Sequence, residues 1–184
     1  MIFTDLDGSL LNEDDYSFAE AAPALARIGQ LGIPLIIATS KTRVEVETLQ
    51  QEMGMSAPFI VENGGGIFFP DDYRKMAVKD AVIPLGVPYA EIRAFLEALP
   101  GSIRVRGFGD LTERELAAIS GLTLEQAALS KQREFTEPFI LEDAAVLPLL
   151  EGRAAMAGLQ VVRGGRFHHL IGAGQDKGRA VRLL

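Results

Sequence analysis

Two carboxylates stand two positions apart near the start of the chain, directly after a short apolar run. Met1–Leu6 predicts a buried strand, and Asp5, Asp7 and Gly8 mark the point where it ends. One carboxylate can act as a nucleophile and the other as a proton donor when a bound cation and different surroundings separate their pKa values. An acidic turn is the alternative. A calcium loop is excluded because the later acid and terminal Glu of such a loop are not in place.

The segments that follow predict how these side chains are positioned. Phe18–Gly32 has apolar residues at helical spacing, and Ile33–Ala38 is a continuous apolar run expected of a strand covered on both faces. A capping box formed by Thr42 and Glu45 opens a second helix, and 59–61 predicts a third strand. This alternation predicts a parallel, doubly wound α/β sheet whose strand carboxyl ends share one edge.

The pattern changes after this first part. Residues 71–88 contain two prolines and predict a connection, and Gly164-Gly165 between two apolar runs predicts a hairpin. We therefore predict a Rossmann-like core made of 1–84 and 171–184, interrupted by an α+β cap domain at 85–170. Within the cap we expect strands at 103–108, 139–141, 159–163 and 166–171 and a helix at 144–157.

Composition narrows the class of function. The chain has 184 residues, with 18 basic and 25 acidic residues, a net charge of −7 and 48% hydrophobic residues. This balance argues against intrinsic disorder and against general nucleic-acid binding. The absence of cysteine excludes disulfides and thiolate metal sites. The longest apolar stretch, near 33–38, is far shorter than the roughly 20 residues that span a bilayer, and we expect a cytoplasmic protein with a small-molecule substrate. No feature of the sequence indicates an oligomeric state.

Three separated motifs together resemble the haloacid dehalogenase-like phosphohydrolases. They are the DxDGSL string after the first strand, Thr39-Ser40 at the end of the second, and Lys177 at a late helix start. The resemblance implies that Asp5 attacks phosphorus to form an aspartyl-phosphate, that Asp7 is the acid and base, and that Thr39 and Lys177 hold the phosphoryl oxygens. Ser40 is a second candidate for the hydroxyl. Mg²⁺ bound by Asp5 and Asp7 is also implied, and phosphoryl transfer does require positive charge around three oxygens.

Four longer strings narrow the resemblance to the subfamily with α/β caps, and within it to the mannosyl-3-phosphoglycerate phosphatase family. They are Thr39–Arg43, Glu62–Gly65, Arg133–Phe139 and Gly164–His168. The implied reaction removes phosphate from mannosyl- or glucosyl-3-phosphoglycerate and yields a glycosylglycerate, a compatible solute. A broad-specificity sugar-phosphate phosphatase and a module that binds a phosphorylated sugar without turnover are the alternatives.

A substrate with a phosphate, a carboxylate and a sugar predicts complementary residues in the cap. Arg133 can bind a carboxylate through two parallel hydrogen bonds. Glu134 and Glu137 can accept hydrogen bonds from sugar hydroxyls, and His168 matches a family string and can contact the substrate. The alternatives are a solvated charged segment for 133–137 and a surface histidine for His168.

Other expected substrate contacts lie in the core. Asn63 and the Gly64 backbone can line the mouth of the site, although Gly64–Gly66 is also typical of a hairpin turn. Lys41 can face the substrate or simply form the polar start of a helix. The expected core residues that bind substrate are Ser9, Ser40, Lys41, Asn63 and Gly64.

The family also has an acidic G-D-x-x-N-D loop after a further strand beyond the lysine helix, which completes its magnesium site. Asp176–Leu184 is the last segment of this chain, so that loop is not in it. We therefore expect either a fragment of a longer enzyme or a catalytically impaired chain.

Overall fold

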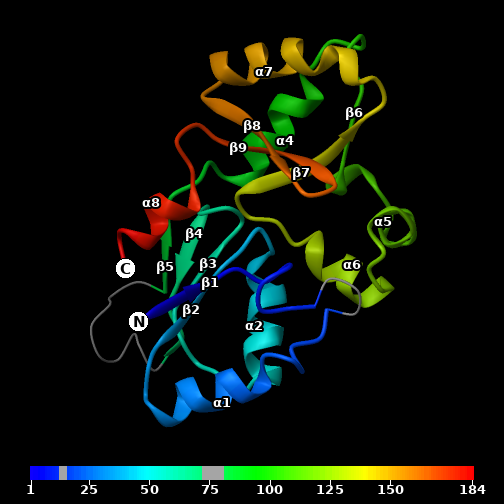
Figure 1. Cartoon of the computed structure of the whole chain (residues 1–184). Coiled ribbons are helices and arrows are strands. Elements are labelled where there is room, and N and C mark those ends of the chain that lie inside the picture. The colour runs from blue at the N-terminus through cyan, green and yellow to red at the C-terminus, as the bar shows by residue number, and fades with distance from the viewer. Residues whose placement is uncertain (13–15, 72–80) are drawn as a thin grey trace. The chain divides into compact units, whose positions relative to one another are not determined.

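The computed structural model describes residues 1–12, 16–71 and 81–184. The chain forms two compact units. Unit 1 comprises Met1–Lys41, Val46–Leu85 and Asp176–Leu184, and unit 2 comprises Thr42–Glu45 and Gly86–Gln175. Each unit has its own sheet (Figure 1).

Unit 1 is built on a five-stranded sheet in the order β1-β2-β3-β4-β5. Its first three strands are parallel, as predicted, and β4 and β5 continue the sheet in antiparallel pairing. The parallel strands follow one another as neighbours because each crossover helix returns the chain to the next position. The strands are β1 (Ile2–Thr4), β2 (Leu35–Ala38), β3 (Phe59–Val61), β4 (Gly66–Phe68) and β5 (Val82–Pro84).

Unit 1 contains α1 (Ala22–Gln30), α8 (Lys177–Val181) and α2 (Arg43–Glu52) from Val46 onward. α1 begins four residues after the predicted Phe18, with Pro23 in its first turn, where a proline's missing N–H is not needed. The predicted capping box before α2 is present, because Glu45 Oε2 accepts the Thr42 N–H at 2.8 Å. α8 packs Ala180 against Ala38, Ile60 and Ile67 of the sheet.

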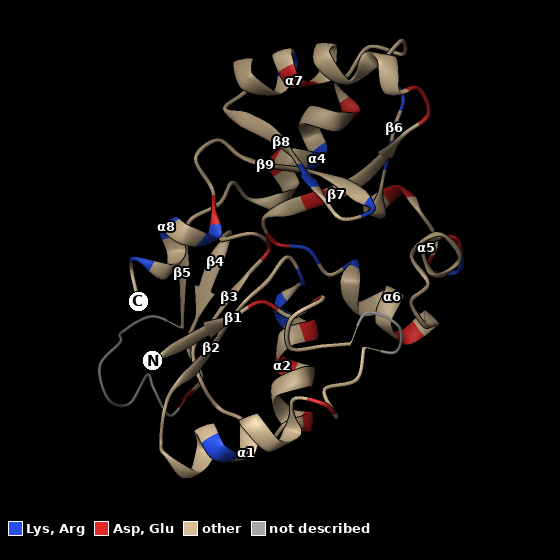
Figure 2. Ribbon diagram, in the orientation of Figure 1, with Lys and Arg blue, Asp and Glu red and all other residues tan. Residues whose placement is uncertain are grey.

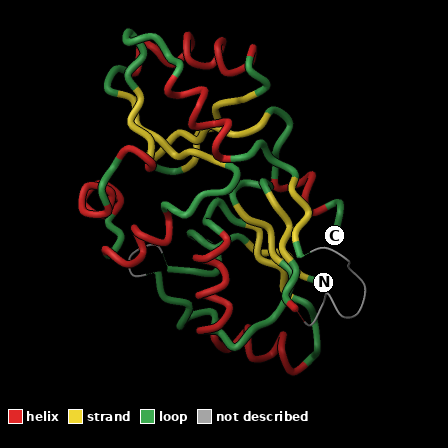
Figure 3. The backbone as a smooth tube through the Cα atoms, turned by 180° about the vertical axis from the view of Figure 1, so that it is seen from behind, coloured by secondary structure: helices red, strands yellow, loops and turns green. Residues whose placement is uncertain are grey.

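Unit 2 contains an antiparallel sheet in the order β6-β7-β9-β8, seen from behind in Figure 3. The predicted hairpin joins β8 to β9, but its two-residue turn is Gly165-Arg166, one residue later than predicted, because Gly164 pairs with Phe167. Gly165 has a φ of 46°, which glycine adopts without strain. The strands are β6 (Val105–Gly107), β7 (Thr136–Leu141), β8 (Leu159–Gly164) and β9 (Phe167–Gly172). The helices are α4 (Tyr89–Glu97), α5 (Glu113–Ser120), α6 (Leu124–Ser130) and α7 (Leu147–Met156).

All four strands of unit 2 differ from their predicted limits, β8 and β9 by one residue and β6 and β7 by more. β6 ends at Gly107, before the predicted Phe108, because 108–110 forms a 3₁₀ turn in which Asp110 Oδ2 accepts the Gly107 N–H at 2.8 Å. β7 begins at Thr136, three residues earlier than predicted, and its first four residues are buried. The core of unit 2 joins α4, α7 and the sheet through Ile92, Phe139, Leu150, Ala154 and Leu170.

Charged residues of both signs recur in each unit, and the charged residues of α8 are basic, Lys177 and Arg179 (Figure 2). Among the described residues, every helix is too short or too polar to cross a membrane.

Candidate active site

Asp5 and Asp7 lie in the loop that leaves β1 at the carboxyl edge of the parallel sheet. The fully buried Leu6 side chain anchors this loop between them, and Asp5 Oδ1 accepts the Leu6 N–H at 2.8 Å. The two carboxylates are 44% and 48% exposed. Gly8 follows with a φ of 66°, and the Ser9 N–H donates to the Leu6 carbonyl at 3.1 Å. The tight turn therefore holds both carboxylates where solvent can reach them.

Lys177, 172 positions later, lies directly beside Asp5. Its Nζ donates to Asp5 Oδ2 at 2.5 Å. The first turn of α8 fixes this lysine, since Asp176 Oδ1 accepts the Arg179 N–H at 2.8 Å. Asp5 and Lys177, which sequence analysis paired by family resemblance, are therefore neighbours.

Gly64 allows the β3–β4 turn to lie against the start of α8. Its φ is 87°, and a Cβ there would collide with the backbone oxygen of Asp176. Asn63 precedes it with a φ of 59°, and its N–H donates to the Thr39 carbonyl at 3.0 Å. The glycine run thus forms a hairpin turn between β3 and β4, which was the alternative to lining the mouth of the site. This turn also contacts the start of α8, where Lys177 lies.

Thr39 follows β2 at the same edge of the sheet and is fully buried. Its N–H donates to the Ile60 carbonyl at 3.0 Å, and its hydroxyl oxygen accepts the Lys41 N–H at 3.2 Å. The hydroxyl proton is left to donate elsewhere. Ser40, the second candidate for this role, is partly buried.

Lys41 approaches Asp7, which sequence analysis did not foresee. Its Nζ lies 3.1 Å from Asp7 Oδ1, and the lysine side chain is only 16% exposed. The same Nζ lies 5.0 Å from the centre of the Tyr16 ring, within the range of a cation–π attraction. Tyr16 was not predicted as a site residue, because nothing local in the sequence links it to Lys41.

The geometry thus places one lysine beside each carboxylate. Charges a few ångströms apart interact strongly when water is partly excluded, so the lysines hold the carboxylates in place and add positive charge near them. Two lysines and two carboxylates therefore lie together at this edge of the sheet.

Among the described residues there is no cluster of three or more histidine, aspartate or glutamate side chains that could hold a metal. Asp5 and Asp7 alone still suit Mg²⁺, since this ion commonly uses one or two carboxylates and completes its shell with water and substrate phosphate.

In unit 2, Arg133 and Glu134 already have polar partners. Arg133 Nε donates to the Ser130 carbonyl at 2.8 Å, and its guanidinium lies 5.7 Å from the Phe108 ring centre. Glu134 Oε1 accepts from Arg43 Nε at 2.8 Å. Both side chains are partly exposed, so they form an ordered polar segment.

Glu137 was expected to accept hydrogen bonds from a sugar, but its side chain is fully buried. Its Oε1 accepts the Gly109 N–H at 2.9 Å, and its Oε2 lies 3.6 Å from Arg93 Nη1. Burial raises the pKa of Glu137, although hydrogen bonds from Tyr89 and Gly109 oppose this shift. In this structure a sugar hydroxyl has no open path to the carboxylate.

His168 lies on β9 and stacks on Phe139 of β7, with ring centres 5.5 Å apart. It is half-buried, whereas His169 is buried, which agrees with the expectation that adjacent strand residues face opposite ways.

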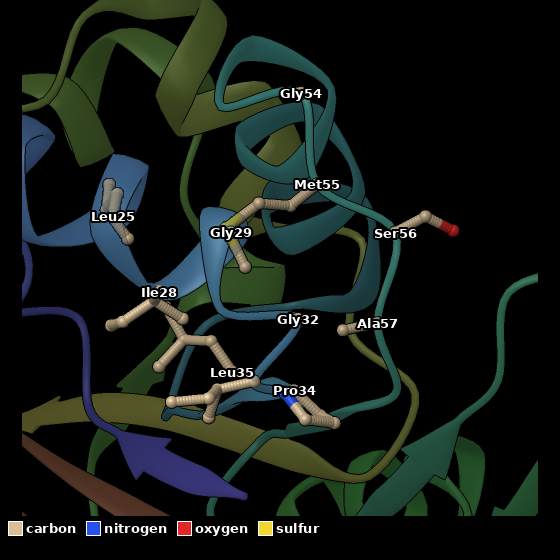
Figure 4. A pocket seen from close by; sticks show the side chains of 11 residues that line it. Leu25, Ile28, Gly29, Gly32, Pro34, Leu35, Gly54, Met55, Ser56 and Ala57 are labelled. Carbon is tan, nitrogen blue, oxygen red and sulfur yellow. The ribbon is translucent and has the colours of Figure 1, made fainter.

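A pocket of about 270 Å³ lies at the other end of the parallel strands of unit 1 (Figure 4). It runs between the end of α1, the start of β2 and the segment after α2. Its lining includes Leu25, Ile28, Leu35, Met55 and Ala57. None of the predicted site residues lines it, so it is separate from the carboxylate–lysine edge.

The parallel sheet and its carboxylate–lysine edge define an α/β protein with a site suited to phosphoryl groups. A profile of the haloacid dehalogenase-like hydrolases matches residues 2–100. The chain belongs to the haloacid dehalogenase-like hydrolase family.

Curated relatives align along the whole chain. The glucosyl-3-phosphoglycerate/mannosyl-3-phosphoglycerate phosphatase of Persephonella marina is 50% identical over 190 residues, which cover 100% of this chain and 71% of the relative. A protein of the same name from Methanococcoides burtonii is 41% identical over 198 residues, with the same coverage. The crystal structure of a Thermoplasma acidophilum protein superposes with a TM-score of 0.69 at 21% identity, covers 100% of this chain and 70% of that one, and supports the fold.

Proposed function

We propose that this chain is a phosphatase of glucosyl- and mannosyl-3-phosphoglycerate. The observation that carries the proposal is the 50% identity to the Persephonella marina phosphatase along the full length of this chain. The lysine–carboxylate geometry supports the reaction type, because Asp5 and Lys177 are adjacent at the edge where α/β folds place their sites.

In the proposed reaction a carboxylate oxygen of Asp5 attacks phosphorus, and the bond from phosphorus to the glycerate oxygen breaks. Asp7 donates a proton to that leaving oxygen. Asp7 then takes a proton from water as the water attacks the aspartyl-phosphate, which releases inorganic phosphate and restores Asp5. Lys177 and the Thr39 hydroxyl bind the phosphoryl oxygens and stabilise their charge.

Asp5 and Asp7 would hold Mg²⁺, which when bound would supply positive charge to the phosphoryl oxygens. The loops that follow β1 and β2 would supply further polar groups for the phosphate end of the substrate. These are Ser9, Ser40 and Lys41. Asn63 and Gly64 would line the mouth of the site.

We assign unit 1 to catalysis and unit 2 to the cap that recognises the rest of the substrate. Arg133 would bind the glycerate carboxylate, since its side chain is partly exposed and a planar guanidinium matches the geometry of a carboxylate. Glu134 and His168, both partly exposed, would contact the sugar.

The test is phosphate release by the chain with Mg²⁺ from mannosyl-3-phosphoglycerate, glucosyl-3-phosphoglycerate and a panel of simple sugar phosphates. The proposal predicts that kcat/KM for the two glycosyl-3-phosphoglycerates exceeds the panel values by about a hundredfold, through a bound carboxylate. Equal turnover of the panel would indicate a broad-specificity phosphatase. Binding without any phosphate release would indicate a binding module.

A further inference from the structure

The turn Gly107–Asp110 of unit 2 is held by a carboxylate at each end. Asp110 Oδ2 accepts the Gly107 N–H at 2.8 Å, and Glu137 Oε1 accepts the Gly109 N–H at 2.9 Å. Arg93 links the two acids, since it forms an ion pair with Asp110 and its Nη1 lies 3.6 Å from Glu137 Oε2. The conformation of the turn therefore depends on a charged network that joins the buried Glu137 to the exposed Asp110 through Arg93.

The backbone of this turn lies too close to its neighbours to accept side chains at two positions. A Cβ on Gly107 would collide with the Glu137 carboxylate, and one on Gly109 would lie 2.7 Å from the Tyr89 hydroxyl oxygen. Glu137 and Tyr89 thus form the surface on which the turn rests. Between the two glycines, Phe108 is the residue whose side chain this arrangement directs.

Phe108 in turn contacts Arg133. The Phe108 ring is 5% exposed and meets Phe167 edge to face at 4.9 Å. The Arg133 guanidinium lies 5.7 Å from the Phe108 ring centre, a distance at which the ring attracts a cation. Movement of the turn would therefore move the ring against which Arg133 lies.

We propose that Glu137 is a positioning residue for Arg133, acting through the Gly109 N–H and the Phe108 ring. This inference rests on the proposed function, in which Arg133 binds the substrate carboxylate, and it replaces the direct sugar contact expected of Glu137 from sequence. The Glu137 carboxylate is fully buried and accepts the Gly109 N–H, so it acts on the substrate site through the turn that it positions.

Calorimetry on the 184-residue chain tests the proposal with two probes, 3-phosphoglycerate and inorganic phosphate. Glu137→Leu removes the acceptor for Gly109, whereas Glu137→Gln retains an oxygen that can accept it. If Arg133 is no longer positioned, its charge-assisted contact with the substrate carboxylate is lost. We therefore expect Glu137→Leu to raise the Kd of 3-phosphoglycerate about tenfold and to leave the Kd of phosphate unchanged. Glu137→Gln should restore most of the affinity.

Gly109→Ala moves the turn by a different route and remains informative if Glu137→Leu fails to fold. It should also weaken 3-phosphoglycerate selectively. The matched control is Gly152→Ala on α7, where a Cβ has no neighbour within 4 Å and no effect on either Kd is expected. In an Arg133→Ala background, Gly109→Ala should have no further effect, because the positioned group is gone.

Unchanged 3-phosphoglycerate binding in Glu137→Leu and Gly109→Ala would overturn the proposal, as would equal weakening of both probes. The NMR signal of Arg133 Nε–H separates this failure from failure of the proposed function. If the wild type binds 3-phosphoglycerate no better than phosphate, the substrate assignment of Arg133 fails. A shift of that signal in Gly109→Ala still supports the positioning role, and an unshifted signal refutes it.

Discussion

At the scale of single residues, the two lysine–carboxylate pairs were predictable to different degrees. Asp5 and Lys177 could be paired from motif resemblance, and their Nζ–Oδ2 distance of 2.5 Å places them together. The contact of Lys41 with Asp7 could not be predicted, because it depends on how two loops from different strands bend at the sheet edge. The burial of Glu137 was also missed, since its charged neighbours in sequence suggested a solvated segment.

Gly64 gives a prediction about backbone strain. Gly64→Ala combines an unfavourable positive φ with a collision against Asp176, so it should lower the free energy of unfolding by about 2–4 kcal/mol. Gly54→Ala is the matched control, because Gly54 has a φ of 65° and no neighbour within 4 Å of a Cβ. It should cost only about 1 kcal/mol. Urea denaturation measures both, and equal losses would contradict the collision.

Glu137 gives a prediction about pH. Burial raises the pKa of Glu137 in the folded state above its value near 4.5 in the unfolded chain. The protonated carboxyl therefore contributes its full stability below pH 4.5, and this stability is lost as the pH rises through the raised pKa. Glu137→Gln is neutral throughout and lacks this loss. The melting temperature of Glu137→Gln minus that of wild type should therefore increase as the pH rises from 4.5 through the raised pKa of Glu137. A difference that is constant with pH would show that the carboxyl is not shifted.

Among the secondary-structure elements, the capping box at Thr42 predicted the start of α2, whereas α1 begins four residues after its predicted start. Thr112 accepts the Glu115 N–H and Thr123 accepts the Gln126 N–H, so capping boxes of the kind predicted at Thr42 also open α5 and α6. Such boxes can be predicted because all their atoms lie within four residues. The limits of β6 and β7 were predicted poorly, because strand length depends on partners far away in sequence and on the Gly107–Asp110 turn.

The cap of α5 can be tested by substitution. Thr112→Ala removes the acceptor for the Glu115 N–H and should destabilise unit 2 by about 1 kcal/mol. Thr112→Ser keeps a hydroxyl oxygen and should be close to wild type. Thermal unfolding of the three proteins provides the measurement, and an alanine variant as stable as the serine variant would refute the capping role.

At the scale of the whole molecule, composition and the alternation of apolar runs indicated a parallel α/β sheet and a separate antiparallel sheet, and both are present. Each unit has its own apolar cluster, one around Ile60 and Ile67 and the other around Phe139 and Leu150. Separate cores predict that damage to one unit remains largely within it.

Leu150→Ala should therefore act on unit 2. Leu150 is fully buried, so the truncation should cost about 2–5 kcal/mol there. Hydrogen exchange should show faster exchange of amides in β7 and β9 than in wild type, while amides of β2 and β3 keep their protection. Equal acceleration in both sheets would mean that the two units unfold as one.

We propose Asp5 as the nucleophile of a glycosyl-3-phosphoglycerate phosphatase. Mannosyl-3-phosphoglycerate carrying a radiolabelled phosphate, mixed with the chain and Mg²⁺ and quenched in acid, tests it most directly. We expect label bound covalently at Asp5, and neither label nor phosphate release in a folded Asp5→Asn variant. Phosphate release by Asp5→Asn at the wild-type rate would contradict the account.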